Sequence, residues 1–311
     1  MALNLPEALA IPAARSPRAF LPGDASANAR TLIAWALFDW IVIGVAWAAM
    51  SLIGGRWVAI VGTVIVASRL HALGAILHDA CHTRRAAKPP AWWVVEMLAG
   101  WPIASTIEAM RYHHSRHHVA SGTPADPYHD TVHARTTWRR HVLTLRGALL
   151  PVWWTLRAVV SPVALLVPSA RTGYARAFLQ DRSGRDLRDH AGVRACARAD
   201  IVQLAAQTVV LGSAFAADLP ILTFYVLPWM LAGMLNARRV VYEHAWLTSE
   251  RRSRHQVWET TVDHDLGRIG NAIFYPHNIG MHRIHHLLPT VSFVHLPRLA
   301  ATILSTGRRQ T

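Results

Sequence analysis

The chain has 311 residues, of which 52% are hydrophobic, and its mean hydropathy is +0.20. This composition excludes an ordinary soluble protein of the same size and indicates several membrane spans. The formal net charge of +14 fits loops that lie against anionic lipid. The sequence contains no basic stripe interleaved with base-stacking aromatic residues, so it predicts no nucleic-acid partner.

The N-terminal region is rich in proline and lacks the apolar segment and cleavage site of a signal peptide, so residues 1–30 are predicted to form a flexible tail. The apolar run at residues 32–53 is long enough to cross a bilayer as a helix. After a Gly-Gly-Arg turn, a second span is predicted over residues 57–77. These two spans form a hairpin that returns the chain to the side on which it started.

Both spans of this hairpin contain a charged residue, Asp39 in the first and Arg69 in the second. A charged side chain inside a bilayer is costly, and it usually pairs with another polar group. We therefore predict an ion pair between Asp39 and Arg69 across the hairpin. The alternative is that Asp39 lies where its helix meets the membrane interface.

Two later apolar runs, residues 201–217 and 221–236, form a second predicted hairpin, while residues 91–107 and 148–167 are ambiguous. Arginine clusters flank residues 148–167 on both sides, so the positive-inside rule favours an interfacial or re-entrant helix there. The predicted fold is an all-α integral membrane protein with about four transmembrane helices in two hairpins, interfacial helices and a histidine-rich metal-binding cap. Both termini and the cap are predicted to be cytoplasmic.

Histidines are unusually abundant, with 19 in the chain, and several of them form spaced clusters. The first cluster is an i, i+4 pair at the end of the second span. Two later segments have the pattern H-x-x-H-H, which places three imidazoles on one helix face, so each segment is expected to offer three nitrogens to a common centre. A single histidine follows the last span. The nine predicted metal ligands are His78, His82, His114, His117, His118, His244, His282, His285 and His286.

Nine imidazoles are enough to bind two metal ions and to leave positions open, whereas a structural zinc site needs only four ligands. The set therefore predicts a two-metal catalytic site. Iron, copper, zinc and nickel all accept imidazole nitrogen, so the ligands alone do not select the metal. Only two cysteines occur, which is too few for a thiolate site.

A ligating imidazole usually donates its second N–H to a carboxylate or carbonyl oxygen. Asp79 and Glu243 are each adjacent in sequence to a predicted ligand, and we predict that they support the ligands in this way. Asp126, Asp263 and Asp265 are further candidates for this role, but for them the sequence favours a loop charge or a helix cap.

The ordered clusters resemble the three histidine boxes of the membrane fatty acid desaturase superfamily, H-x(3-4)-H, H-x(2-3)-H-H and a late H/Q-x(2-3)-H-H. Residues 69–79 are similar to the approach to the first box in bacterial members, and residues 122–127 resemble the Asp-Pro stretch after the second. Arg239 and Asn278 match positions in the family's R-x-x-x-E-H and N-x-x-x-H-x-x-H-H-L-x-P motifs, so the resemblance places both beside the ligands. It also assigns residues 31–311 to one desaturase-like membrane domain.

Three positions depart from the pattern of that superfamily. Met281 stands where an aromatic residue is usual, Arg283 precedes Ile284 where an acidic residue is often found, and Cys81 replaces a small residue. These departures bear on substrate and subfamily more than on metal binding.

The resemblance implies a non-haem di-iron centre, with two iron ions and dioxygen as co-substrate, which removes hydrogen from an unactivated C–H bond. The expected activity is desaturation of the acyl chain of a lipid or acyl thioester in the bacterial inner membrane. A separate ferredoxin, rubredoxin or cytochrome is the implied electron donor.

Two other functions were weighed against desaturation. One is a hydroxylase or ketolase of the same scaffold, acting on a fatty, carotenoid or specialised-metabolite substrate. The other is a metal transporter, which is disfavoured because its ionisable residues would line a path through the spans, whereas the histidine boxes lie at span ends.

Overall fold

The computed structural model describes residues 24–83, 89–129, 136–244 and 253–307. Within these ranges the regular structure is helical, and the only bridge between extended residues joins His244 to Thr261. The predicted all-α fold is therefore confirmed. Residues 1–23 of the predicted N-terminal tail lie outside the described ranges, and the first described helix begins at Ala29.

Four helical stretches are long and apolar enough to cross a membrane, which agrees with the predicted number. They are α2 (Ala29–Leu52), α3 (Arg56–Cys81), α10 (Ala191–Ala216) and the stretch Thr137–Leu166, which combines α7 (Thr137–Arg146), η4 (Gly147–Leu149) and α8 (Leu150–Leu166).

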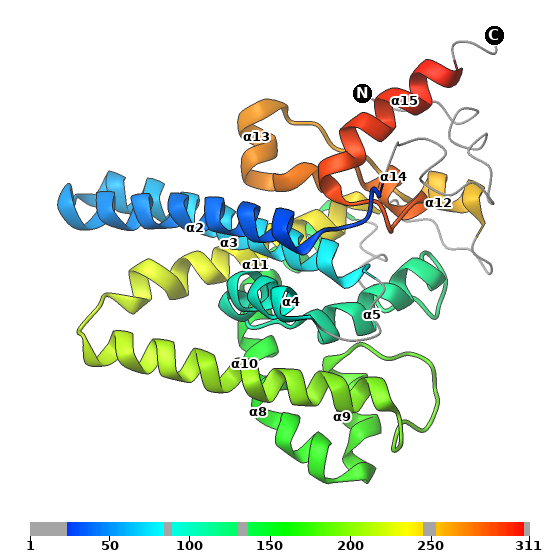
Figure 1. Cartoon of the computed structure of the whole chain (residues 1–311), viewed down its shortest axis with the longest axis horizontal. Coiled ribbons are helices and arrows are strands. Elements are labelled where there is room, and N and C mark those ends of the chain that lie inside the picture. The colour runs from blue at the N-terminus through cyan, green and yellow to red at the C-terminus, as the bar shows by residue number, and fades with distance from the viewer. Residues whose placement is uncertain (1–23, 84–88, 130–135, 245–252, 308–311) are drawn as a thin grey trace.

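One member of this set differs from the prediction. We expected residues 148–167 to be interfacial or re-entrant. The ten residues of α7 precede this segment, and the combined stretch Thr137–Leu166 is long enough to cross a membrane. The predicted span at residues 221–236 is instead divided between a π-helical turn, η6 (Leu222–Val226), and the 17-residue helix α11 (Leu227–Glu243). Figure 1 shows that α2, α3, α10 and α11 run along the long axis of the molecule, whereas α8 runs across them.

The remaining helices are short and connect or cover these long ones. In chain order they are α4 (Pro90–Val95), η2 (Glu96–Gly100), η3 (Trp101–Ile103), α5 (Ile107–Ala120), η5 (Pro168–Ala170), α9 (Arg171–Phe178), α12 (Arg254–Thr260), α13 (Gly267–Phe274), η7 (Pro276–Asn278), α14 (His282–Leu287), η8 (Phe293–His295) and α15 (Leu296–Gly307). The C-terminal segment is residues 253–307. The main hydrophobic core joins it to α2 and α3, through residues such as Ile43, Leu73 and Leu299.

A buried ion pair joins α2 to α3, as predicted. The Arg69 guanidinium donates to the Asp39 carboxylate at 3.0 Å, and Asp39 is completely buried. The second Asp39 oxygen lies 2.8 Å from Nε2 of His277 in η7, a contact that sequence analysis missed. Arg69 also donates to the carbonyl oxygen of Ala272 in α13. Asp39 and Arg69 therefore attach the C-terminal segment to the membrane hairpin.

Replacing Asp39 with asparagine is expected to lower the free energy of unfolding by about 1.5–3 kcal/mol, since it removes a hydrogen bond between charged groups. The midpoint of thermal unfolding in detergent measures this loss. The double variant Asp39→Asn/Arg69→Met removes the unpaired cation and is expected to recover part of it. Additive effects of the two substitutions would show that the pair does not couple the helices.

Backbone approaches backbone where η4 crosses α11. A Cβ atom added to Gly147 would lie 2.6 Å from the carbonyl oxygen of Gly233 and 2.5 Å from Cβ of Ala237. No side chain fits at such a distance, so this crossing requires glycine.

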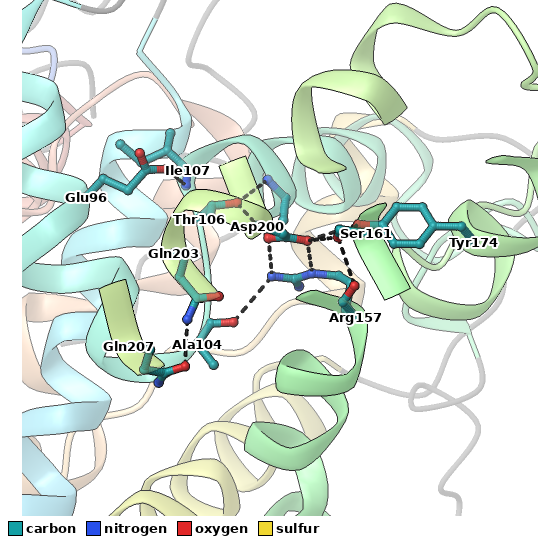
Figure 2. A network of polar contacts seen from close by, with 11 residues as sticks. Glu96, Ala104, Thr106, Ile107, Arg157, Ser161, Tyr174, Asp200, Gln203 and Gln207 are labelled. Atoms are coloured by element: carbon teal, nitrogen blue, oxygen red, sulfur yellow. Dashed lines mark hydrogen bonds and ion pairs between the residues drawn. The ribbon is translucent and has the colours of Figure 1, made fainter. Parts of the chain in front are cut away.

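A buried polar network fixes the start of α5, the helix that carries the second histidine box. Figure 2 shows Asp200 of α10 at its centre. The Arg157 guanidinium donates to both Asp200 oxygens, at 2.7 and 3.0 Å, and the Tyr174 hydroxyl donates to one of them at 2.9 Å. Thr106, the N-cap of α5, donates to Asp200 at 3.3 Å and accepts from the backbone N–H of Ala109. The network thus links α8, α9 and α10 to the N-terminus of α5.

Candidate metal centre

The structure brings all nine predicted histidines together in two neighbouring groups. One group contains His78, His82, His114, His118 and His285, and the other contains His117, His244, His282 and His286. Within each group the potential ligand nitrogens lie within 4.8 Å of one another. Every member is buried except His82, which is half-buried. Figure 1 shows α5, α14 and the C-terminal end of α3 gathered at one end of the molecule.

Each H-x-x-H-H box divides its histidines between the two groups. On α5, the i, i+4 pair His114 and His118 joins the first group, while His117 joins the second. On α14, the i, i+4 pair His282 and His286 joins the second group. The expectation that three nitrogens of a box share one centre is therefore corrected. At about 100° per residue, positions i+3 and i+4 lie on opposite sides of position i, so one helix face serves two centres.

The ring nitrogens lie as close together as ligands around one ion. His118 Nε2 is 2.8 Å from Nε2 of His114 and 3.0 Å from Nε2 of His285, and in the other group His282 Nε2 is 3.0 Å from Nε2 of His244. One N–H can satisfy one such contact, but not two at once. Two imidazole nitrogens bound at right angles to a metal at about 2.1 Å are about 3 Å apart, so these spacings fit a metal-binding site.

The chemistry of the donors also fits a cation. Among the described residues, His78, His82 and His117 each have a buried Nε2 atom without a hydrogen-bond partner. Burial, with a smaller contribution from the charge of Arg111, lowers the pKa of His82 to about 4. Burial and the neighbouring imidazoles hold the pKa of His118 well below its usual value. Neutral imidazole is the form that binds metal, so the described residues fit metal ions.

The predicted supporting carboxylates lie in different surroundings. Glu243 accepts from Arg239 at 2.7 Å and lies 3.4 Å from Nδ1 of His282, an atom that has no hydrogen-bond partner among the described residues. Asp79 instead accepts from the Ser292 hydroxyl at 2.6 Å and from the backbone N–H of Phe293 at 3.2 Å, and it has no hydrogen bond to an imidazole of the described residues.

Asn278 likewise contacts η8 rather than a ligand. Its side-chain amide donates to the carbonyl oxygen of Phe293 at 3.2 Å. Asp79 and Asn278 therefore both hold the chain after the third box, and their effect on the ligands is indirect.

Asp126, which was interpreted as a loop charge, orients a predicted ligand directly. Its Oδ1 atom lies 2.8 Å from Nδ1 of His117 and accepts from the backbone N–H of Tyr128 at 2.8 Å, while Oδ2 accepts from the N–H of Gly122 at 3.0 Å. Asp126 is completely buried. The available sequence signal was its place in the Asp-Pro stretch after the second box.

Replacing Asp126 with asparagine is expected to lower metal affinity by about 10–100-fold, because the imidazole of His117 loses the carboxylate that fixes its orientation. Titration of the metal-free protein with iron measures the change. Asp186→Asn is the matched control, because Asp186 lies on an exposed loop far in sequence from the nine clustered histidines, and it is expected to bind iron like the wild type. Equal affinities of both variants would show that Asp126 does not support the site.

A cavity of about 580 Å³ adjoins the first histidine group. His78 lines it at one end, and aromatic side chains from three helices, including Trp153, Trp154 and Trp229, line its walls. Trp153 and Leu149 are 45% and 59% exposed, so the cavity opens to the outside on the side of η4 and α8.

The four long apolar helices make this chain an integral membrane protein. A search of curated proteins found no match to it. The sequence profile of the fatty acid desaturase family matches residues 55–310, a range that includes all nine clustered histidines. The chain therefore belongs to the fatty acid desaturase family, whose members share an oxidoreductase scaffold.

Proposed function

We propose that this protein is a dioxygen-dependent di-iron desaturase that introduces a double bond into the acyl chain of a lipid or acyl thioester. The observation that carries the proposal is the position of His78, which belongs to the first histidine group and also lines the apolar cavity. A chain held in this cavity lies directly beside the imidazoles. Family membership supports an oxidoreductase acting on such a chain.

In this proposal the nine clustered histidines hold two iron ions, five imidazoles around one and four around the other. When bound, the iron ions supply dioxygen activation and removal of hydrogen from an unactivated C–H bond. The protein supplies position and environment. Asp126 keeps the ring of His117 oriented, and Glu243 places a carboxylate 3.4 Å from Nδ1 of His282. The aromatic walls of the cavity hold the chain and exclude water from the reacting carbon.

The partners and location follow from the same proposal. Electrons come from a separate ferredoxin, rubredoxin or cytochrome, and the substrate comes from the surrounding membrane. The proposal places the metal site on the cytoplasmic side of a bacterial inner membrane.

The test is chemical analysis of the purified, iron-loaded protein supplied with a reductant and extracted lipids. We expect about two irons per chain, oxygen uptake that depends on the reductant, and a product that has lost two hydrogens. A product that has gained one oxygen atom would assign the protein to the hydroxylase branch instead. Ion flux through the protein in liposomes, without iron binding or oxygen uptake, would contradict the proposal.

A further inference from the structure

Tyr128 lies between the cavity and both histidine groups. Its ring centroid is 4.3 Å from that of His117 and 6.4 Å from that of His114, which belong to different groups. The same side chain lines the cavity together with His78. A molecule that fills the cavity therefore contacts Tyr128 where it approaches the metal-binding imidazoles.

The position of Tyr128 relative to the histidines is fixed by one carboxylate atom. Oδ1 of Asp126 accepts from the backbone N–H of Tyr128 at 2.8 Å and lies at the same distance from Nδ1 of His117. The backbone of Tyr128 and the imidazole of His117 are therefore held by the same carboxylate, and the phenol ring packs 4.3 Å from that imidazole, centroid to centroid.

The phenol hydroxyl itself has no hydrogen-bond partner among the residues that the structure describes. Tyr128 is half-buried, and the surrounding cavity walls are largely apolar. A tyrosine phenol is protonated at neutral pH and is a good donor. A ligand oxygen in the cavity would satisfy this donor, whereas an alkyl chain would leave it unsatisfied.

Of the three arginines that line the cavity, two are paired within the protein, and the third, Arg146, is exposed at the end of α7. Arg157 is paired with Asp200, and Arg239 is paired with Glu243, in each case at 2.7 Å. These guanidinium groups therefore have no net charge to offer to an anion. A neutral oxygen, such as a carbonyl or hydroxyl, matches this wall better than a carboxylate or phosphate, whose burial would leave an unpaired charge.

We propose that Tyr128 determines substrate specificity by donating a hydrogen bond from its phenol to a neutral carbonyl or hydroxyl oxygen of the substrate. The inference rests on the proposed function and narrows its substrate class. The oxygen lies within a few bonds of the carbon that is oxidised, because the phenol lies beside both histidine groups. A plain hydrocarbon chain is then a poorer ligand than a chain of the same length with one carbonyl.

The experiment compares the binding of tritiated 2-dodecanone and dodecane, which differ by one carbonyl oxygen, to iron-loaded protein without reductant. The wild type is expected to bind the ketone more tightly. Tyr128→Phe is expected to weaken ketone binding by about two- to tenfold and to leave alkane binding unchanged. For each probe we compare the dissociation constants of the wild type and of Tyr128→Phe. Partitioning of the probe into detergent affects both constants equally and cancels in their ratio.

Tyr225→Phe is the matched control, because the Tyr225 hydroxyl already bonds to Gln207 and Pro102 and does not line the cavity. It is expected to keep the wild-type preference. Equal binding of both probes by the wild type, or an unchanged preference in Tyr128→Phe, would overturn the inference.

An infrared measurement on the wild type does not depend on the variant folding. The stretch of a ¹³C-labelled ketone carbonyl is expected to move to lower wavenumber on binding, and an unshifted band would also overturn the inference. Iron content and reductant-dependent oxygen uptake of the same preparation test the proposed function separately. A preparation that lacks both but prefers the ketone would reject the di-iron function and retain the role of Tyr128.

Discussion

Replacing His285 with alanine is expected to lower the iron affinity of the first histidine group and to abolish reductant-dependent oxygen uptake. His285 occupies a central position in the first histidine group. Its Nε2 atom is 3.0 Å from that of His118, and its ring centroid is 4.6 Å from that of His78. The second group keeps all four of its imidazoles, so only the iron of the first group is expected to be bound more weakly. Metal analysis and an oxygen electrode measure the two quantities.

His141→Ala is the matched control for this variant, since His141 is exposed on α7 and belongs to neither group. We expect its iron content and oxygen uptake to equal those of the wild type. Full iron content and full activity in His285→Ala would contradict the assignment of the first group as a metal site.

Replacing Asp200 with alanine is expected to destabilise the protein by about 3–5 kcal/mol, because it leaves the guanidinium of Arg157 buried without its counter-charge. Both side chains of this pair are almost completely buried. The loss is measured as a lower midpoint of unfolding in detergent. Because Asp200 also holds Thr106 at the N-terminus of α5, iron affinity is expected to fall with stability.

The double variant Arg157→Met/Asp200→Leu removes both charges and so tests how much of the lost stability comes from the unpaired guanidinium. Removing both charges avoids an unpaired buried ion, so this variant is expected to be more stable than Asp200→Ala alone. A double variant that is less stable than the single one would show that the unpaired charge of Arg157 is not the main cost of losing Asp200.

Sequence spacing predicted that these histidines converge, but not to which of the two groups each one belongs. The periodicity of a helix shows that His114, His117 and His118 share a face. The division between two centres depends on how α5 lies relative to α14, and that arrangement comes from tertiary packing. The Asp39–Arg69 pair was predictable for a simpler reason, because a charge in an apolar span needs a counter-charge within reach.

Two polar features could not be identified from local sequence. Asp200 follows several arginines and resembles a surface residue, yet its partner Arg157 is 43 positions away on a crossing helix. Asp126 reaches His117 only because the chain turns sharply after α5, with Gly122 at a φ of 76°. In the same way, hydropathy measures length and composition but does not detect the π-helical turn that divides residues 221–236.

The two glycines at the crossing of η4 and α11 both line the cavity. At this point main-chain atoms, and not side chains, therefore determine the width of the cavity. Trimming a side chain cannot widen it here, and adding even one methyl group forces a whole helix to shift. A cavity that accepts a bulkier substrate would therefore need substitutions at the tryptophans of its walls, while Gly147 and Gly233 stay unchanged.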